Sequence, residues 1–182
     1  YAQGEFTTAI GTQSSAAGVR ATALGQSARA VDYSTAIGRD ARAEFASSVS
    51  VGGATRAQGA NATVIGTDAA AAADASALGK GAVAATNAVG KQAQAGGPGA
   101  VAIGLSSKAN SFLSVAIGSG AEAGTFTNTA LGALSSATAA QSVALGTSST
   151  ADRDYSVSIG NVAMRRQLVN LADGTQDYDA VN

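Results

Sequence analysis

Residues 101–123 read VAIGLSSKANSFLSVAIGSGAEA, and the tetrad Val-Ala-Ile-Gly occurs twice in this stretch, fourteen residues apart. The same pattern, mostly Ala followed by Ile, Leu or Val and then Gly, occurs twelve times in the 182-residue chain. The spacings between successive glycines are 14, 13, 14, 14, 13, 11 and then 14 five times. So constant a period predicts a repeat architecture. The repeat glycines are Gly11, Gly25, Gly38, Gly52, Gly66, Gly79, Gly90, Gly104, Gly118, Gly132, Gly146 and Gly160.

Two more columns keep this register. The fifth residue after each of the first eleven glycines is Ala, and the third is Ala, Ser or Thr. The position between these two columns often carries a charge. Small–charged–small alternation is typical of a strand with one face in water. Each repeat therefore predicts two short strands, joined by a turn in which Gly permits a positive φ. Coils of this length are too short for two helices, so we expect an all-β solenoid of about fourteen residues per coil.

The strand before each Gly carries no charge on either face in any of the twelve copies. A strand without a polar face is normally buried on both sides. We expect the Ile, Leu and Val side chains to fill a thin core and the small residues to face a second copy of the chain. The alternative is that the small residues simply tolerate exposure.

Composition excludes several functions. His and Cys are both absent, which rules out imidazole-dependent triads, His-ligated metals and disulfides. The net charge is −1, without a basic patch that would favour nucleic acid. The segment Gly79-Lys80-Gly81 lacks the spacing of a phosphate-binding loop. No apolar run reaches the ~20 residues of a membrane-spanning helix. We therefore expect no enzyme, cofactor or metal.

Two sets of residues are candidates for ligand contact. Aromatic residues recur five to seven positions before a repeat Gly, where they would either anchor a protein ligand or seal the corners of the coils. Charges recur between the two small columns, where they would either meet an acidic ligand or keep a repetitive surface soluble. The aromatics are Phe6, Tyr33, Phe45, Phe112, Phe126 and Tyr155, and the charges in question are Arg29, Arg42 and Arg56; the same column also carries Lys108 and Glu122.

Three places show how the repeat begins, is shortened and ends. Ala2 falls in the Ala column of a preceding coil, which predicts further repeats upstream. The coil between Gly79 and Gly90 is three residues short, which predicts a local irregularity rather than a domain boundary. Arg165 falls in the Ala column, so the solenoid should have ended before it. Beyond it, Thr175 or Asp177 is suited to cap a helix.

The segments SVAIG (114–118), SVALG (142–146) and SVSIG (156–160) resemble the head repeat of the YadA-like trimeric autotransporter adhesins. The C-terminal stretch is similar to the neck of the same family. The resemblance divides the chain into head repeats over 1–160 and a neck over 161–182. Its matching neck positions include Arg166, Gln167, Asn170, Gly174, Asp179 and Asn182.

This resemblance implies a left-handed parallel β-roll in each chain and a homotrimer. It also implies a neck leading to a coiled-coil stalk, and a membrane anchor outside this sequence. Such heads are cell-surface passengers at the bacterial outer membrane, and they bind host matrix proteins of the collagen, fibronectin or laminin class.

Three other functions are alternatives to adhesion. The column of Thr8, Thr22 and Thr35 suits an ice-binding solenoid, but Val replaces Thr in much of the chain. A phage fibre is also a trimeric solenoid, but the neck pattern argues against it. A β-helical enzyme would need a clustered pair of carboxylates, which the sequence lacks.

Overall fold

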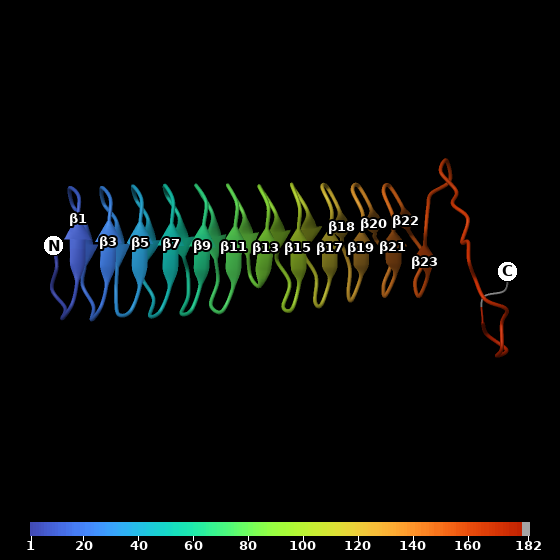
Figure 1. Ribbon diagram of the computed structural model, residues 1–182, viewed down its shortest axis with the longest axis horizontal. Coiled ribbons are helices and arrows are strands. Elements are labelled where there is room, and N and C mark those ends of the chain that lie inside the picture. The colour runs from blue at the N-terminus through green and yellow to red at the C-terminus, as the bar shows by residue number, and fades with distance from the viewer. Residues whose placement is uncertain (180–182) are drawn as a thin grey trace.

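The computed structural model describes residues 1–179, and it confirms the predicted all-β parallel solenoid with coils of about fourteen residues. Two parallel sheets of very short strands lie back to back along one axis, as Figure 1 shows. Residues 1–179 contain no helix.

Each coil contributes one strand to each sheet. The twelve-stranded sheet contains β1 (Thr8–Ile10), β3 (Thr22–Leu24), β5 (Thr35–Ile37), β7 (Val49–Val51), β9 (Thr63–Ile65), β11 (Ser76–Leu78), β13 (Asn87–Val89), β15 (Val101–Ile103), β17 (Val115–Ile117), β19 (Thr129–Leu131), β21 (Val143–Leu145) and β23 (Val157–Ser158). The eleven-stranded sheet contains β2 (Ser15–Ala16), β4 (Arg29–Ala30), β6 (Arg42–Ala43), β8 (Arg56–Ala57), β10 (Ala70–Ala71), β12 (Val83–Ala84), β14 (Gln94–Ala95), β16 (Lys108–Ala109), β18 (Glu122–Ala123), β20 (Ser136–Ala137) and β22 (Thr150–Ala151).

Equivalent residues of successive coils pair directly, as the constant period predicts. Ala102 pairs with Ala116, and in the other sheet Ala109 pairs with Ala123. Ala2 forms an isolated bridge to Ala16, in the register expected of a preceding coil. The solenoid is therefore a stack of ladders in which each side chain lies above its counterpart in the next coil.

The core consists of small residues, and here the sequence-based expectation was wrong. Ala102 and Ala109, from the two facing sheets, are both fully buried, whereas Ile103 is 40% exposed and Ile10 is 58% exposed. Because side chains alternate along a strand, burying the Ala column turns the Ile, Leu and Val column outward. The two sheets are joined by tight turns, so the space between them is filled mostly by Ala, Ser and Thr, and Val64 is the one branched apolar side chain that is buried among residues 1–179.

Polar side chains in this core are satisfied by nearby backbone. The hydroxyl of Ser48 donates to the carbonyl of Phe45 at 2.6 Å, and the amide of Asn128 donates to the carbonyl of Ala137 at 2.7 Å. Within residues 1–179 no buried side-chain nitrogen or oxygen lacks a partner. Serine therefore substitutes for alanine in the inner columns without an uncompensated desolvation penalty.

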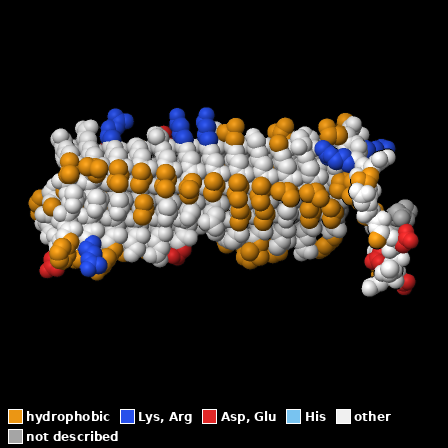
Figure 2. Space-filling model, in the orientation of Figure 1, with side chains coloured by type: hydrophobic (Ala, Val, Ile, Leu, Met, Phe, Trp, Pro, Cys, Tyr) orange, Lys and Arg blue, Asp and Glu red, His pale blue; other side chains and the backbone are white. Residues whose placement is uncertain are grey.

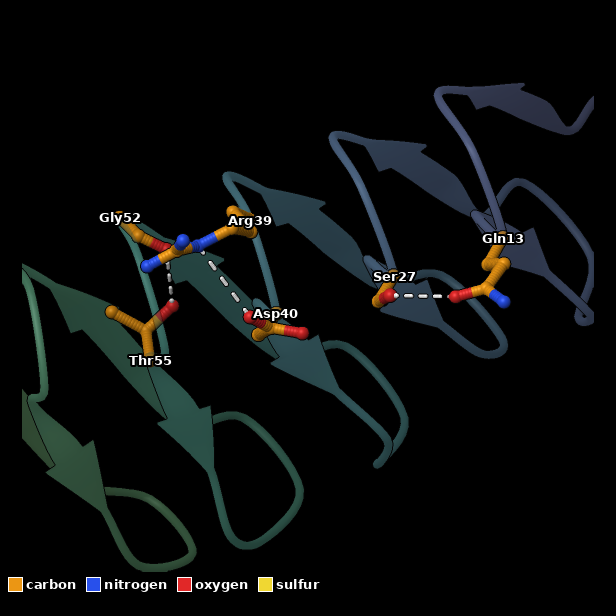
Figure 3. Close-up of polar contacts among 6 residues, drawn as sticks. All are labelled: Gln13, Ser27, Arg39, Asp40, Gly52 and Thr55. Atoms are coloured by element: carbon orange, nitrogen blue, oxygen red, sulfur yellow. Dashed lines mark hydrogen bonds and ion pairs between the residues drawn. The ribbon is translucent and has the colours of Figure 1, made fainter.

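The first corner of each coil follows the repeat Gly. The first eleven repeat glycines have φ between 105° and 137°, whereas Gly160 is not in the left-handed region. The carbonyl of Gly52 also accepts a hydrogen bond from the Thr55 hydroxyl at 3.0 Å, which closes the turn (Figure 3). Across neighbouring coils, the hydroxyl of Ser27 donates to Oε1 of Gln13 at 3.3 Å (Figure 3).

The second corner leads into each strand of the twelve-stranded sheet and forms the lower row of loops in Figure 1. The short coil is accommodated here, because only residues 85–86 separate β12 from β13, whereas residues 96–100 separate β14 from β15. No strand is lost, and β11 pairs with β13 in register. The shortened coil is therefore a local irregularity of a continuous rod.

Candidate functional site

The outer face of the twelve-stranded sheet is an uncharged apolar surface that runs along the rod. Figure 2 shows its hydrophobic side chains as a row across successive coils. Its outward positions are the first and third residues of each three-residue strand, Thr or Val and then Ile, Leu or Val in most coils. A continuous apolar row of this length on a single chain is typical of an interface. We call it the apolar face; its largest exposed members are Ile10, Leu24, Ile65, Val89, Ile103, Leu131 and Leu145.

The sequence did not identify this face correctly, because it assigned these Ile, Leu and Val residues to the core. The available signal was the agreement among four small columns. The inner residues of both strands and the residues beside each corner are Ala, Ser or Thr, except for Val64 and Asn128. These four columns together fill the thin space between the two sheets. The column of Ile, Leu and Val residues must therefore lie on the outer face.

The aromatic candidates all lie at the second corners, and the structure brings two of them together. The rings of Phe112 and Phe126 stack with centroids 5.2 Å apart and an interplanar angle of 14°. Both rings remain more than two-fifths exposed, and Leu113 beside them is about half exposed. Leu113 was missed by the sequence reasoning, although its adjacency to Phe112 was a usable signal. These three residues form an apolar corner patch that offers stacked aromatic surface to a ligand.

The other aromatic candidates are separate from this patch. Phe6, Arg20 and Tyr33 occupy the left-handed position of three consecutive corners. The Arg20 guanidinium lies 6.0 Å from the centroid of the Tyr33 ring, within range of a cation–π interaction. Phe45 and Tyr155 are exposed singly. The six aromatics therefore form one stacked pair and several isolated contacts rather than one continuous site.

Beyond the last strand, Arg166 closes the open end of the solenoid. Its Nη1 donates to the carbonyl of Ile159 at 2.6 Å and to the hydroxyl of Ser149 at 3.0 Å. Its Nη2 donates to the carbonyl of Thr147 at 2.6 Å and to the sulfur of Met164 at 3.1 Å. One guanidinium thus satisfies carbonyl groups that have no further coil to pair with.

The other neck candidates among residues 1–179 are exposed, and no helix begins at Thr175 or Asp177 within the described residues. Gln167, Asn170 and Gly174 lie in irregular chain, and Asn182 lies outside the described residues. The Asp179 carboxylate accepts the backbone N–H groups of Thr175 at 2.8 Å and Gln176 at 3.0 Å. These two hydrogen bonds hold the pKa of Asp179 below its ordinary value, and the bond from Thr175 has the larger effect. The turn therefore weakens only as the pH falls through that lowered pKa.

We expect Arg166→Ala to reduce the free energy of unfolding by about 1–3 kcal/mol, because it leaves several acceptors at the solenoid end without a donor. Arg165→Ala is the matched control, since Arg165 is exposed and makes none of these bonds. Thermal melting of both variants checks the prediction. Equal melting temperatures for the two variants would show that Arg166 does not cap the rod.

Two further kinds of site are absent from the described residues. No group of three Asp, Glu, His or Cys side chains within residues 1–179 could hold a metal ion. Within the same residues, no helix has the length and apolar character needed to cross a membrane.

Comparison with known proteins identifies the same architecture. The sequence matches the family described as "YadA head domain repeat (2 copies)" over residues 2–28, 32–55, 88–107, 129–149 and 137–163, more than half of the chain. No curated protein is significantly similar in sequence. Among solved structures, the collagen-binding domain of the Yersinia adhesin YadA is 31% identical, with a TM-score of 0.57, over 98% of this chain and 93% of that chain.

Proposed function

This chain belongs to the YadA head domain family, and on that premise we propose that it is the head of a bacterial surface adhesin that binds host extracellular matrix proteins. The family and the fold are those of a structural, non-enzymatic protein. The single observation that carries the matrix ligand is the 31% identity to a collagen-binding domain over almost the full length of both chains. Collagen is therefore the first ligand to test, with fibronectin and laminin as the others.

We further propose that the head is a homotrimer in which the apolar faces of three chains meet. The support is physical: the apolar face carries no charge, follows the whole rod and leaves branched side chains such as Ile103 exposed. Burying such side chains against a second and third copy recovers the hydrophobic free energy that the thin Ala core does not supply. The parallel ladder would give each chain the same repeated surface, as a symmetric assembly requires.

The division of the chain follows from the same family assignment. We propose that residues 1–160 form the head and that residues 161–182 form the neck to a coiled-coil stalk. The support is that the last strand ends at Ser158 and that residues 159–179 leave the solenoid without regular secondary structure. The head would then be carried on the bacterial cell surface, at the outer membrane, by an anchor outside this sequence.

We propose that the second corners carry the ligand contacts, because the aromatic candidates are exposed there and the corners lie outside the strands that form the apolar face. In a trimer, three copies of each corner would bind a fibrous ligand repeatedly, so weak single contacts would sum to avidity. Of the six aromatics, the stacked pair Phe112 and Phe126 presents the largest organised surface.

We expect the double substitution Phe112→Ala and Phe126→Ala to weaken collagen binding by about tenfold or more, because aromatic anchors dominate protein interfaces. Leu134→Ala is the control, since Leu134 is a similarly exposed apolar residue at the opposite corner. Solid-phase binding to collagen, fibronectin and laminin is the measurement. If the wild-type chain binds none of the three proteins, the proposal of a matrix ligand is wrong. If the double variant binds as tightly as the wild type, only the proposal that Phe112 and Phe126 contact the ligand is wrong.

A further inference from the structure

Three arginines form a ladder on the outer face of the eleven-stranded sheet. Arg29 in β4, Arg42 in β6 and Arg56 in β8 are direct register partners, and all three side chains are exposed. Adjacent strands lie ~4.8 Å apart, so the ladder extends roughly 10 Å along the rod. The neighbouring rungs of the column, Ser15 and Ala70, are uncharged.

The acidic residues nearby neutralise only one end of this ladder. Glu44 lies 3.5 Å from Arg29, and Asp40 is engaged by Arg39 at 3.6 Å (Figure 3). Within residues 1–179, Arg42 and Arg56 have no carboxylate within ion-pair distance. Two adjacent guanidinium groups are therefore left with their charge uncompensated.

Such a ladder costs stability. Like charges directly opposite each other on neighbouring strands destabilise a sheet. Elsewhere the same column places opposite charges in register, where Lys108 is the partner of Glu122. A local arrangement that opposes folding without a compensating contact in the chain points to a function for that site.

We propose that the ladder of Arg29, Arg42 and Arg56 binds a linear sulfated polysaccharide laid along the rod. Guanidinium groups bind oxyanions through paired hydrogen bonds, and basic clusters of this kind favour sulfated glycans or nucleic acids. A polymer whose sulfates repeat along its length meets successive rungs at once, which a single small anion does not.

Two features favour the glycan over a nucleic acid. The strands of the eleven-stranded sheet contain no aromatic residue, so the ladder has no platform on which bases could stack. The net charge of the chain is −1, without the broad positive field that phosphate backbones require. The ladder also lies on the sheet opposite the apolar face, so it remains accessible whether or not the proposed trimer forms.

The test compares a size-defined heparin oligosaccharide with a hyaluronan oligosaccharide of the same length and with a single-stranded oligonucleotide. Isothermal titration at about 0.1 M salt is suitable, because higher salt screens exposed charges. The variants are Arg42→Gln with Arg56→Gln, and Lys108→Gln as a control that removes one positive charge from the same column but outside the ladder. Thermal melting with and without heparin is the second readout.

We expect heparin to bind the wild type and Lys108→Gln equally and to raise both melting temperatures. The double arginine variant should bind about tenfold more weakly or worse, show no heparin-dependent rise, and melt without ligand no lower than the wild type. Absence of heparin binding, or an equal loss in Lys108→Gln, would overturn the proposal. Binding of hyaluronan or the oligonucleotide as tightly as heparin would overturn the choice of a sulfated glycan.

Discussion

Replacing Gly104 with alanine is expected to reduce the free energy of unfolding by about 3 kcal/mol or more, because two independent penalties coincide at this residue. Its φ of +131° is a conformation that side-chain-bearing residues rarely adopt. An added Cβ would also lie 2.5 Å from the carbonyl oxygen of Gly118 in the next coil. The neighbouring coils hold the backbone of Gly104 and of Gly118 in place. A local shift therefore cannot relieve either the unfavourable φ or the close contact.

Gly53→Ala is the matched control for this substitution. Gly53 also lies in the first corner of a coil, but its φ is not in the left-handed region, and the nearest atom to an added Cβ, Cγ2 of Thr67, is 3.8 Å away. Its variant should melt within a few degrees of the wild type, or slightly higher because Ala restricts the unfolded chain. Chemical denaturation of both variants is the measurement. Similar denaturation midpoints would show that the solenoid does not require glycine at the repeat position.

Two neighbouring residues of β17 should respond in opposite ways to the same substitution. Ala116→Asp places a charge in a fully buried column without a partner, so we expect it to destabilise the solenoid by more than about 4 kcal/mol. Ile117→Asp places the same charge on the apolar face, where the side chain of a single chain reaches solvent. We expect that variant to keep its β-sheet circular dichroism but to lose self-association.

This pair of variants tests which side of the strand is inside. Loss of β structure in Ile117→Asp together with a folded Ala116→Asp would reverse the assignment of the two columns. Glu122→Gln is a useful reference, because Glu122 is already an exposed charge on the opposite sheet. Its melting temperature should remain near that of the wild type, which shows that the effects at β17 depend on position rather than on charge alone.

The repeat predicted the path of the chain but not the orientation of its side chains. The constant spacing of Gly104 and Gly118 sets the register of successive coils, and the observed pairing of Ile103 with Ile117 follows from it. An uncharged strand, however, has no polar face to mark its outer side. Hydrophobicity alone favoured Ile103 inside, whereas the short turns between the sheets leave room mostly for small side chains, with Val64 and Asn128 as the largest that are fully buried. The thickness of the core depends on both strands of a coil together. The pattern of one strand alone therefore predicted the wrong side chains in the core.

The candidate sites were predictable to different degrees. The positions of Phe112 and Phe126 at the corners follow from the repeat, and their stacking follows from equivalent positions in consecutive coils. The contacts of Arg166 could not be read from periodicity, because they depend on how the chain turns back after the repeat has ended. The arginine ladder was visible as a column, but its lack of acidic partners is a matter of side-chain geometry.

Sedimentation equilibrium of the 182-residue chain measures directly whether the apolar face joins three chains. We predict a mass of three chains for the wild type and of one chain for Ile117→Asp. A wild-type chain that sediments as a monomer, or an Ile117→Asp variant that keeps the three-chain mass, would contradict it.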